Sequence, residues 1–200
     1  MARPRRHDPD RRERIVDAAL RVVGRDGIAG LSHRTVAAEA DVPLGSTTYH
    51  FASLDELLVA ALRRANATFG RTLRDSPELA DPDTDLATAL ARIMGRWLGG
   101  DRREAELAYE LYLAALRRPA LRPVADEWVD EVRTALAGRT DPATARGLVA
   151  MTDGLSLMYL LGGHGYEEEY ARSMLARVLD EGSEPPAVPL AEPPTAPTDT

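Results

Sequence analysis

The chain has 200 residues, no cysteine and a formal net charge of −7. Without cysteine it can form no disulfide and no thiolate metal site, and it has no cysteine nucleophile. No run of residues approaches the roughly 20 apolar positions of a membrane span, and the N-terminal sequence lacks the apolar stretch of a secretory signal, so we expect a cytoplasmic protein with no membrane partner.

Positive charge is concentrated at the N-terminus. Residues 1–25 contain eight arginines and four acidic residues, a local balance of +4, so the remaining 175 residues carry −11. A basic end on an acidic body is typical of a protein that brings local positive charge to an anionic partner such as the DNA backbone. A solvated charged tail explains the basic arm, residues 1–10, equally well.

Helical periodicity, capping residues and breakers predict four helices in the first third of the chain, over residues 11–26, 32–40, 44–50 and 53–74. Ser32 can cap the second helix, and Asp41-Val42-Pro43 ends it. Ser53 and Glu56 have the spacing of a capping box, which begins the fourth helix.

Five further helices are predicted over residues 84–98, 101–116, 121–136, 141–161 and 167–180. No run alternates β-branched with polar residues over the length of a strand. The predicted fold is therefore all α with about nine helices, divided into an N-terminal three-helix domain and a larger C-terminal helical domain. Residues 182–200 hold six of the fourteen prolines, and we expect this tail to be disordered.

The third predicted helix, residues 44–50, is short and polar. Its serine, threonine, tyrosine and histidine side chains suit hydrogen bonds to base edges and phosphates, and Gly45 lets the backbone approach closely. Two short helices joined by a tight turn and braced on either side form a helix-turn-helix unit when the second can enter the major groove. An ordinary helical hairpin explains the same pattern equally well.

The segment from Arg12 to Leu62 resembles the N-terminal signature of the tetracycline-repressor (TetR) family. The matching positions follow in order and at unbroken spacing: Ile15, Ala18, Ala19, Gly27, Ser32, Val42, Gly45, Ser46, Tyr49, Phe51, Ser53, Glu56, Leu57 and Leu58. The resemblance implies a homodimer that binds a double-stranded DNA operator and a small-molecule effector. It implies no enzymatic activity, cofactor or metal.

The resemblance assigns DNA contacts to the second and third helices, at Ser32, His33, Arg34, Leu44, Gly45, Ser46, Thr47, Thr48, Tyr49 and His50. Arg34 could donate both hydrogen bonds to a guanine, whereas Phe51 matches an apolar brace. Three positions depart from the family pattern: Thr48 replaces a tyrosine, Asp41 the turn glycine and Leu54 a lysine. We expect weaker sequence-independent DNA affinity, which the arginine-rich arm partly restores.

Aromatic and methionine side chains on several C-terminal helices could line one ligand pocket: Met94, Trp97, Tyr109, Tyr112, Trp128, Met151, Met158 and Tyr159. Core packing explains any one of them alone. Glu106, Glu110 and Asp126 are polar candidates near that surface, or parts of a solvated face. His164 lies among glycines and is interpreted as a loop residue, and a transition-metal site has little support.

The predicted helix over residues 141–161 mixes apolar with small residues, which allows close helix approach, so this helix and the last one are predicted to form a two-fold four-helix interface. The interface candidates are Leu148, Asp153, Leu155, Met158, Met174, Leu175 and Val178. Asp153 is a candidate buried partner across the two-fold axis.

The predicted organisation is a basic arm (1–10), a helix-turn-helix domain (11–52), a ligand-binding and dimerisation domain (53–181) and a proline-rich tail (182–200). The favoured function is a repressor that a small molecule releases from its operator. The alternative is a ligand-independent regulator or activator of the same fold. A helical enzyme or a protein-interaction adaptor has no supporting motif.

Overall fold

A computed structural model describes residues 10–162 and 165–180, which form helices and turns without a strand. The elements are α1 (Arg11–Asp26), the 3₁₀ turn η1 (Ile28–Gly30), α2 (His33–Glu39), α3 (Leu44–His50), α4 (Leu54–Arg74), α5 (Pro77–Ala80), α6 (Leu86–Gly99), α7 (Arg102–Ala114), η2 (Pro119–Leu121), α8 (Arg122–Leu136), α9 (Pro142–Gly162) and α10 (Glu168–Asp180). The prediction of an all-α fold is confirmed.

Helix α5 was not predicted, because its four residues are too few to show a helical period. Ser76 begins this helix because its Oγ accepts a hydrogen bond from the backbone N–H of Leu79, at 3.3 Å, with Pro77 at the first helical position. The other nine helices lie within a few residues of their predicted bounds.

Serine side chains begin α2 and α4 as predicted. Ser32 Oγ accepts from the N–H of Thr35 at 3.0 Å, and Ser53 Oγ accepts from the N–H of Glu56 at 3.1 Å. The Glu56 carboxylate reaches back to the N–H of Ala52, at 2.7 Å. Caps of this kind stabilise a helix by about 1 kcal/mol each, and they fix where α2 and α4 enter the fold.

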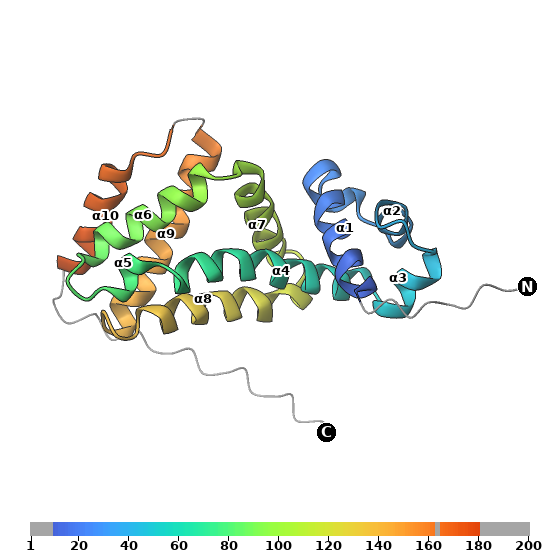
Figure 1. Cartoon of the computed structure of the whole chain (residues 1–200), viewed down its shortest axis with the longest axis horizontal. Coiled ribbons are helices and arrows are strands. Elements are labelled where there is room, and N and C mark those ends of the chain that lie inside the picture. Colours follow the sequence, from blue (N-terminus) through green and yellow to red (C-terminus); the bar gives the residue numbers. More distant parts are fainter. Residues whose placement is uncertain (1–9, 163–164, 181–200) are drawn as a thin grey trace, which may run out of the picture.

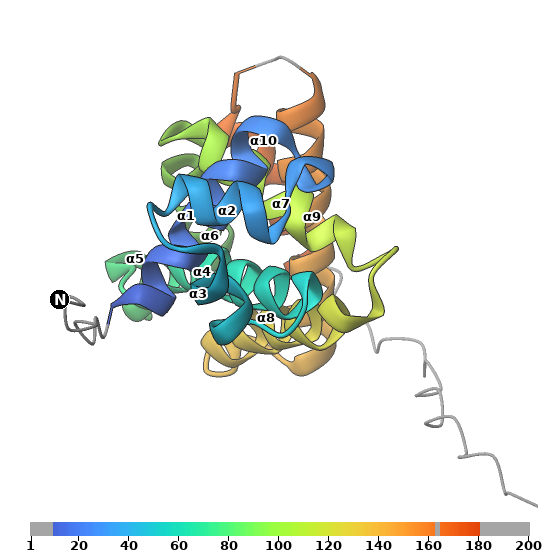
Figure 2. The ribbon, with the colours of Figure 1, turned by 90° about the vertical axis from the view of Figure 1, so that its right-hand side faces the viewer.

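The described helices form a head of α1–α3 at one end and a larger body of α5–α10 at the other, and α4 runs from one to the other (Figure 1). Helix α8 lies alongside α4. When the molecule is turned by 90°, the head faces the viewer in front of the body (Figure 2). The head therefore projects from the body.

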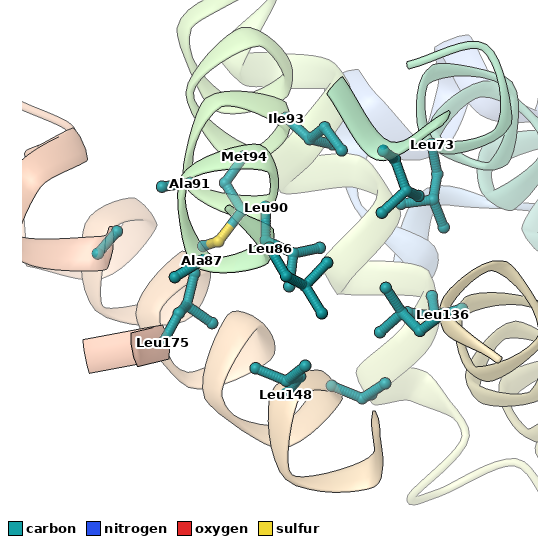
Figure 3. Packing of buried hydrophobic residues seen from close by; sticks show 14 of the residues in the cluster. Leu73, Leu86, Ala87, Leu90, Ala91, Ile93, Met94, Leu136, Leu148 and Leu175 are labelled. Atoms are coloured by element: carbon teal, nitrogen blue, oxygen red, sulfur yellow. The ribbon is translucent and has the colours of Figure 1, made fainter. Parts of the chain in front are cut away.

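Two clusters of buried apolar side chains support this arrangement. The head cluster joins α1 to the first half of α4 through Leu57, Leu58 and Leu62, and Leu111 of α7 and Leu121 of η2 complete it. The body cluster joins α6, α9 and α10 to the second half of α4, and Figure 3 shows part of it. Helix α4 therefore belongs to both clusters.

Some predictions fall outside the described residues, namely all of the basic arm except Asp10, His164, and the proline-rich tail 182–200. Among the described residues, no helix is both long and apolar enough to cross a membrane.

Candidate DNA-binding surface and ligand cavity

The turn between α2 and α3 depends on Asp41, which has a left-handed backbone with φ of 51°. Glycine adopts this region most readily, and aspartate is one of the few other residues that tolerates it. The structure therefore explains how Asp41 can stand at the position of the family's turn glycine.

Two arginines of α1 hold α2 in place. Arg21 Nε donates to Glu39 Oε1 at 2.7 Å, and Arg25 Nη1 donates to Glu39 Oε2 at 2.9 Å. These hydrogen bonds lower the pKa of Glu39. The Glu39 carboxylate stays ionised at neutral pH and keeps α2 against α1.

Helix α3 presents a polar face to solvent. Tyr49 is 85% exposed and Leu44 46% exposed, Gly45 and Thr48 are exposed, and Ser46 and His50 are half-buried. The Tyr49 and His50 rings pack edge to face, with centroids 5.1 Å apart. Because nothing in the described chain covers this face, it is available to a groove of DNA.

Thr47 does not share that face, so its assignment as a DNA contact is wrong. Its side chain is completely buried, and its hydroxyl donates to the backbone oxygen of Leu44 at 2.8 Å. The seven residues of α3 complete about two turns, so one residue in the middle must face α2. Thr47 anchors the helix.

The first turn of α2 offers one exposed cation. Arg34 is exposed, whereas His33 is half-buried and the Ser32 hydroxyl is engaged as the helix cap. The Nδ1 atom of His33 is buried and has no hydrogen-bond partner among the described residues. Arg34 is therefore the α2 side chain best placed to reach DNA.

Phe51 ends α3 and is completely buried in the head cluster. The Arg12 guanidinium lies over its ring, 4.9 Å from the centroid, at a distance typical of a cation–π contact. Its predicted role as an apolar brace fits this position.

A methyl group at Gly45 would meet no atom within 4 Å. Glycine in a helix costs roughly 0.5–1 kcal/mol relative to alanine, so nothing inside the chain explains this residue. We expect Gly45→Ala to raise the free energy of unfolding by up to that amount while weakening operator binding, because the added methyl would stand against the DNA backbone. Chemical denaturation measures the stability and a DNA titration measures the operator affinity. If Gly45→Ala raises both the stability and the operator affinity, the backbone at Gly45 does not approach the DNA closely.

The body holds a small cavity of about 30 Å³ between α4, α6, α7, α8 and α9. Four predicted pocket residues line it, Met94, Trp97, Tyr109 and Trp128, and Tyr112 lines an adjoining cavity of about 30 Å³. Other lining residues were not predicted from the sequence, among them Phe69, Leu90, Thr152 and Ser156. We call the first cavity the inner chamber and the adjoining cavity the outer chamber.

Asp153 is the acidic residue of both chambers. The Tyr109 hydroxyl donates to Asp153 Oδ1 at 3.0 Å. Burial raises the pKa of Asp153, and burial together with the nearby carboxylate raises the pKa of Tyr109. No arginine of the described residues forms an ion pair with Asp153, so the chambers hold an unpaired acidic group among aromatic rings.

The outer side of α9 faces α10 and solvent. A groove there is lined by Gly147, Ala150, Met151, Gly154, Leu155, Met158, Tyr170 and Met174. Met158 is 63% exposed and Leu161 84% exposed. Met151, Met158 and Tyr159 do not line the two chambers, so the pocket prediction is wrong for these three.

The interface prediction needs three corrections. Leu148 and Leu175 are completely buried within one chain, and Asp153 faces the chambers, so none of the three can pack against a second copy. Val178 is half-buried and lies against α9, 3.1 Å from the place where a side chain at Gly147 would begin. Leu155, Met158 and Met174 lie on the groove as an interface requires.

Two of the polar candidates make other contacts. Glu106 pairs with Arg102, and Glu110 Oε1 accepts from the N–H of Ile28 at 2.9 Å, which joins α7 to the head. Neither lines a chamber. Within residues 10–162 and 165–180, no group of three histidine or acidic side chains could hold a metal ion.

Comparison with known proteins finds the same two parts. A family model described as bacterial regulatory proteins of the tetR family matches residues 15–61, and one described as a tetracyclin repressor-like C-terminal domain matches residues 81–181. The chain is 30% identical over 165 residues to the nicotine-responsive transcriptional repressor HdnoR of Paenarthrobacter nicotinovorans. This match covers 75% of this chain and 84% of HdnoR.

Solved structures of a more similar protein match nearly the whole described chain. The multidrug binding protein EbrR complexed with ethidium is 67% identical, with a TM-score of 0.81 over 86% of this chain and 99% of that one. Its complex with malachite green is 66% identical, with a TM-score of 0.78 over 85% of this chain and 98% of that one.

Proposed function

Because the chain belongs to the TetR family of bacterial transcriptional regulators, which are not enzymes, we propose that it is a repressor that leaves its operator when a small organic cation binds in the body. Two observations support the two halves of this proposal. Helix α3 exposes a polar face at the tip of the head, and the body holds a half-buried carboxylate, Asp153, beside aromatic rings.

The DNA contacts that we propose lie on α3 and at the start of α2. Gly45, Ser46, Thr48, Tyr49 and His50 would face the major groove, with Leu44 at its edge. Ser32, His33 and Arg34 would meet the backbone, and Arg34 could also reach a guanine. Thr47 is excluded because it is buried.

The effector that we propose is a flat aromatic cation. A buried carboxylate is costly to desolvate unless a positive charge pairs with it, and aromatic faces attract cations. Asp153 with Tyr109, Trp97 and Trp128 offers both features. The similar protein EbrR is crystallised with ethidium and with malachite green, which are cations of this class.

We also propose that the protein is a homodimer joined through α9 and α10. The groove on these helices is apolar and rich in small residues, with Leu155, Met158 and Met174 at its centre. A two-fold axis there would pair four helices and present two copies of α3 to major grooves roughly 34–36 Å apart.

Operator binding tests the DNA half of the proposal. With DNA that flanks its own gene, we expect Arg34→Ala together with Tyr49→Ala to weaken binding by about 2–6 kcal/mol, since each lost base contact costs about 1–3 kcal/mol. Fluorescence anisotropy measures the loss. Arg133→Ala serves as the matched control for the loss of one positive charge, because Arg133 pairs with Asp130 on the surface of α8, outside the head and outside the proposed dimer interface.

The effector half is tested with malachite green, because ethidium would also insert between the base pairs of the operator. Wild-type protein should bind malachite green and then release operator DNA. If operator affinity stays constant at saturating malachite green, the proposed effector class is wrong, whereas the proposed DNA contacts are unaffected by that result.

A further inference from the structure

The segment that we propose to read DNA carries little positive charge of its own. Residues 32–56, from the cap of α2 to the first turn of α4, contain one arginine and four acidic residues, a local balance of −3. Two arginines of α1 pair with Glu39, which cancels only one of these carboxylates. Proteins gain much of their affinity for DNA from cations that neutralise phosphates. Positive charge from another part of the chain is therefore needed beside this segment.

The segment between α7 and α8 carries such charge. Residues 111–125 contain three arginines, Arg117, Arg118 and Arg122, and no acidic residue, although acidic residues outnumber basic ones in the whole chain by 32 to 25. Pro119 begins η2 and Pro123 lies in the first turn of α8. Because proline fixes the backbone angle φ, the three arginines are held on a short, stiff loop. We call residues 117–122 the basic loop.

The basic loop lies against the head. Leu121 is completely buried in the head cluster, and the Arg118 guanidinium pairs with the Asp55 carboxylate, with 2.6 Å between Nη1 and Oδ1. Asp55 lies in the first turn of α4, which begins at Leu54, shortly after α3 ends at His50. In the view onto the head, the yellow-green segment between α7 and α8 lies beside the head and is not covered by it (Figure 2). The pair cancels a carboxylate that would repel phosphates.

Two arginines of the basic loop have no carboxylate to neutralise them. Arg117 and Arg122 are exposed, and neither forms an ion pair within the part of the chain that the structure describes. Arg122 Nε donates to the backbone oxygen of Ala115 at 3.4 Å, which orients the guanidinium without cancelling its charge. Elsewhere, exposed arginines such as Arg63 and Arg96 lie against carboxylates. The charge of the basic loop is therefore available to an anionic partner.

Building on the proposed DNA contacts, on which this inference rests, we propose that the basic loop binds phosphates of the operator backbone beside the major groove that α3 enters. Guanidinium groups bind phosphate oxygens through charge-assisted hydrogen bonds. Such contacts add affinity and hold the register of the protein on the duplex, but they do not read its sequence. The body is thus part of the DNA-binding surface, at a place outside the helix-turn-helix.

The salt dependence of DNA binding tests the basic loop. The logarithm of the binding constant falls linearly with the logarithm of the salt concentration, by about 0.9 for each phosphate that the protein neutralises. Arg117→Ala and Arg122→Ala should each make this slope shallower by about 1, and the double variant by about 2. Each variant should weaken binding to operator DNA and to unrelated DNA by the same factor. Fluorescence anisotropy over a series of salt concentrations measures both quantities.

Arg103→Ala is the matched control. Arg103 is an exposed arginine at the start of α7, the end of that helix away from the basic loop, and it has no carboxylate partner among the described residues. Its substitution removes the same charge and should keep the wild-type slope. Because all three arginines are exposed, the melting temperatures of the three single variants should stay close to that of wild type.

Neutral phosphate analogues locate the contact on the DNA. Single methylphosphonate substitutions along the operator should weaken binding of wild type at some positions where they leave the Arg117→Ala, Arg122→Ala double variant unaffected. Those positions are the phosphates that the basic loop binds. Positions that weaken wild type and the double variant equally belong to contacts of the head.

The outcomes distinguish this inference from the proposed function. If Arg117→Ala and Arg122→Ala have the same slope as Arg103→Ala, the basic loop does not bind DNA and the inference is wrong, while the contacts proposed for α2 and α3 are unaffected. If the two variants weaken operator binding but keep the wild-type slope, the loop acts only on the fold of the head, and the inference is also wrong. If wild type binds operator DNA no more tightly than unrelated DNA, the DNA half of the proposed function itself is overturned.

Discussion

Asp153→Asn should lower the affinity for malachite green by on the order of 100-fold, since truncating one partner of a buried charge pair costs about 2–5 kcal/mol. Asparagine keeps the size of the side chain and can still accept the hydrogen bond from Tyr109. The change therefore removes the charge and little else. A fluorescence titration of wild type and variant measures the difference.

The same carboxylate gives the affinity a pH dependence. Burial raises the pKa of Asp153, so acidification protonates it in the folded protein earlier than in an unfolded chain. Malachite green affinity should fall as the pH is lowered through that raised pKa, and Asp153→Asn should not show this fall. Glu106→Gln is the control, because it removes a carboxylate that lies outside the chambers. If Glu106→Gln lowers malachite green affinity as much as Asp153→Asn does, the effect comes from the net charge of the protein and not from the position of Asp153.

The raised pKa also predicts the sign of the stability change. A buried acid that holds its proton more tightly in the folded state destabilises that state once the pH exceeds the folded pKa. The free energy of unfolding should therefore rise as the pH falls through this range. At neutral pH, Asp153→Asn should be at least as stable as wild type in urea.

Phe51→Ala should lower the free energy of unfolding by about 3–5 kcal/mol. The ring is completely buried in the head cluster, ends α3 and carries the Arg12 contact. Typical domains are stable by only about 5–15 kcal/mol, so the variant should be partly unfolded at growth temperature. Urea denaturation followed by circular dichroism measures the loss.

Leu44→Ala is the matched control for Phe51→Ala, because Leu44 lies at the other end of the same helix and is 46% exposed. Substitutions of exposed side chains usually change the free energy of unfolding by about 0.5 kcal/mol or less. Equal losses for the two variants would mean that α3 is not anchored through Phe51.

The helices of the head were predictable because local signals agree there. Ser32 and Ser53 cap helices where their spacing indicates, and the family signature fixes the register between them. Thr47 was misassigned because threonine is polar and the helix is only seven residues long. Composition alone does not show which residue of such a helix is turned inward to hydrogen-bond with its own backbone.

The cavity was less predictable because α9 is apolar on nearly every side. Leu148 and Leu155 have the same chemistry, yet one is completely buried and the other borders an outer groove. Periodicity gives no orientation for such a helix. Phe69 was missed for a related reason, because one aromatic residue on a long amphipathic helix has the pattern of ordinary core until the tryptophans of two other helices are placed beside it.

The membership of α4 in both clusters has a consequence for engineering. Leu111, Leu121 and Val124 lie outside the helix-turn-helix segment and still complete the head cluster. A fragment cut after residue 52 would lose them together with all of α4, and its remaining apolar side chains would face water. The DNA-reading part is therefore not a portable module. Chimaeras that exchange regulatory specificity should place the junction beyond α8, or transplant the α7–α8 residues together with the head.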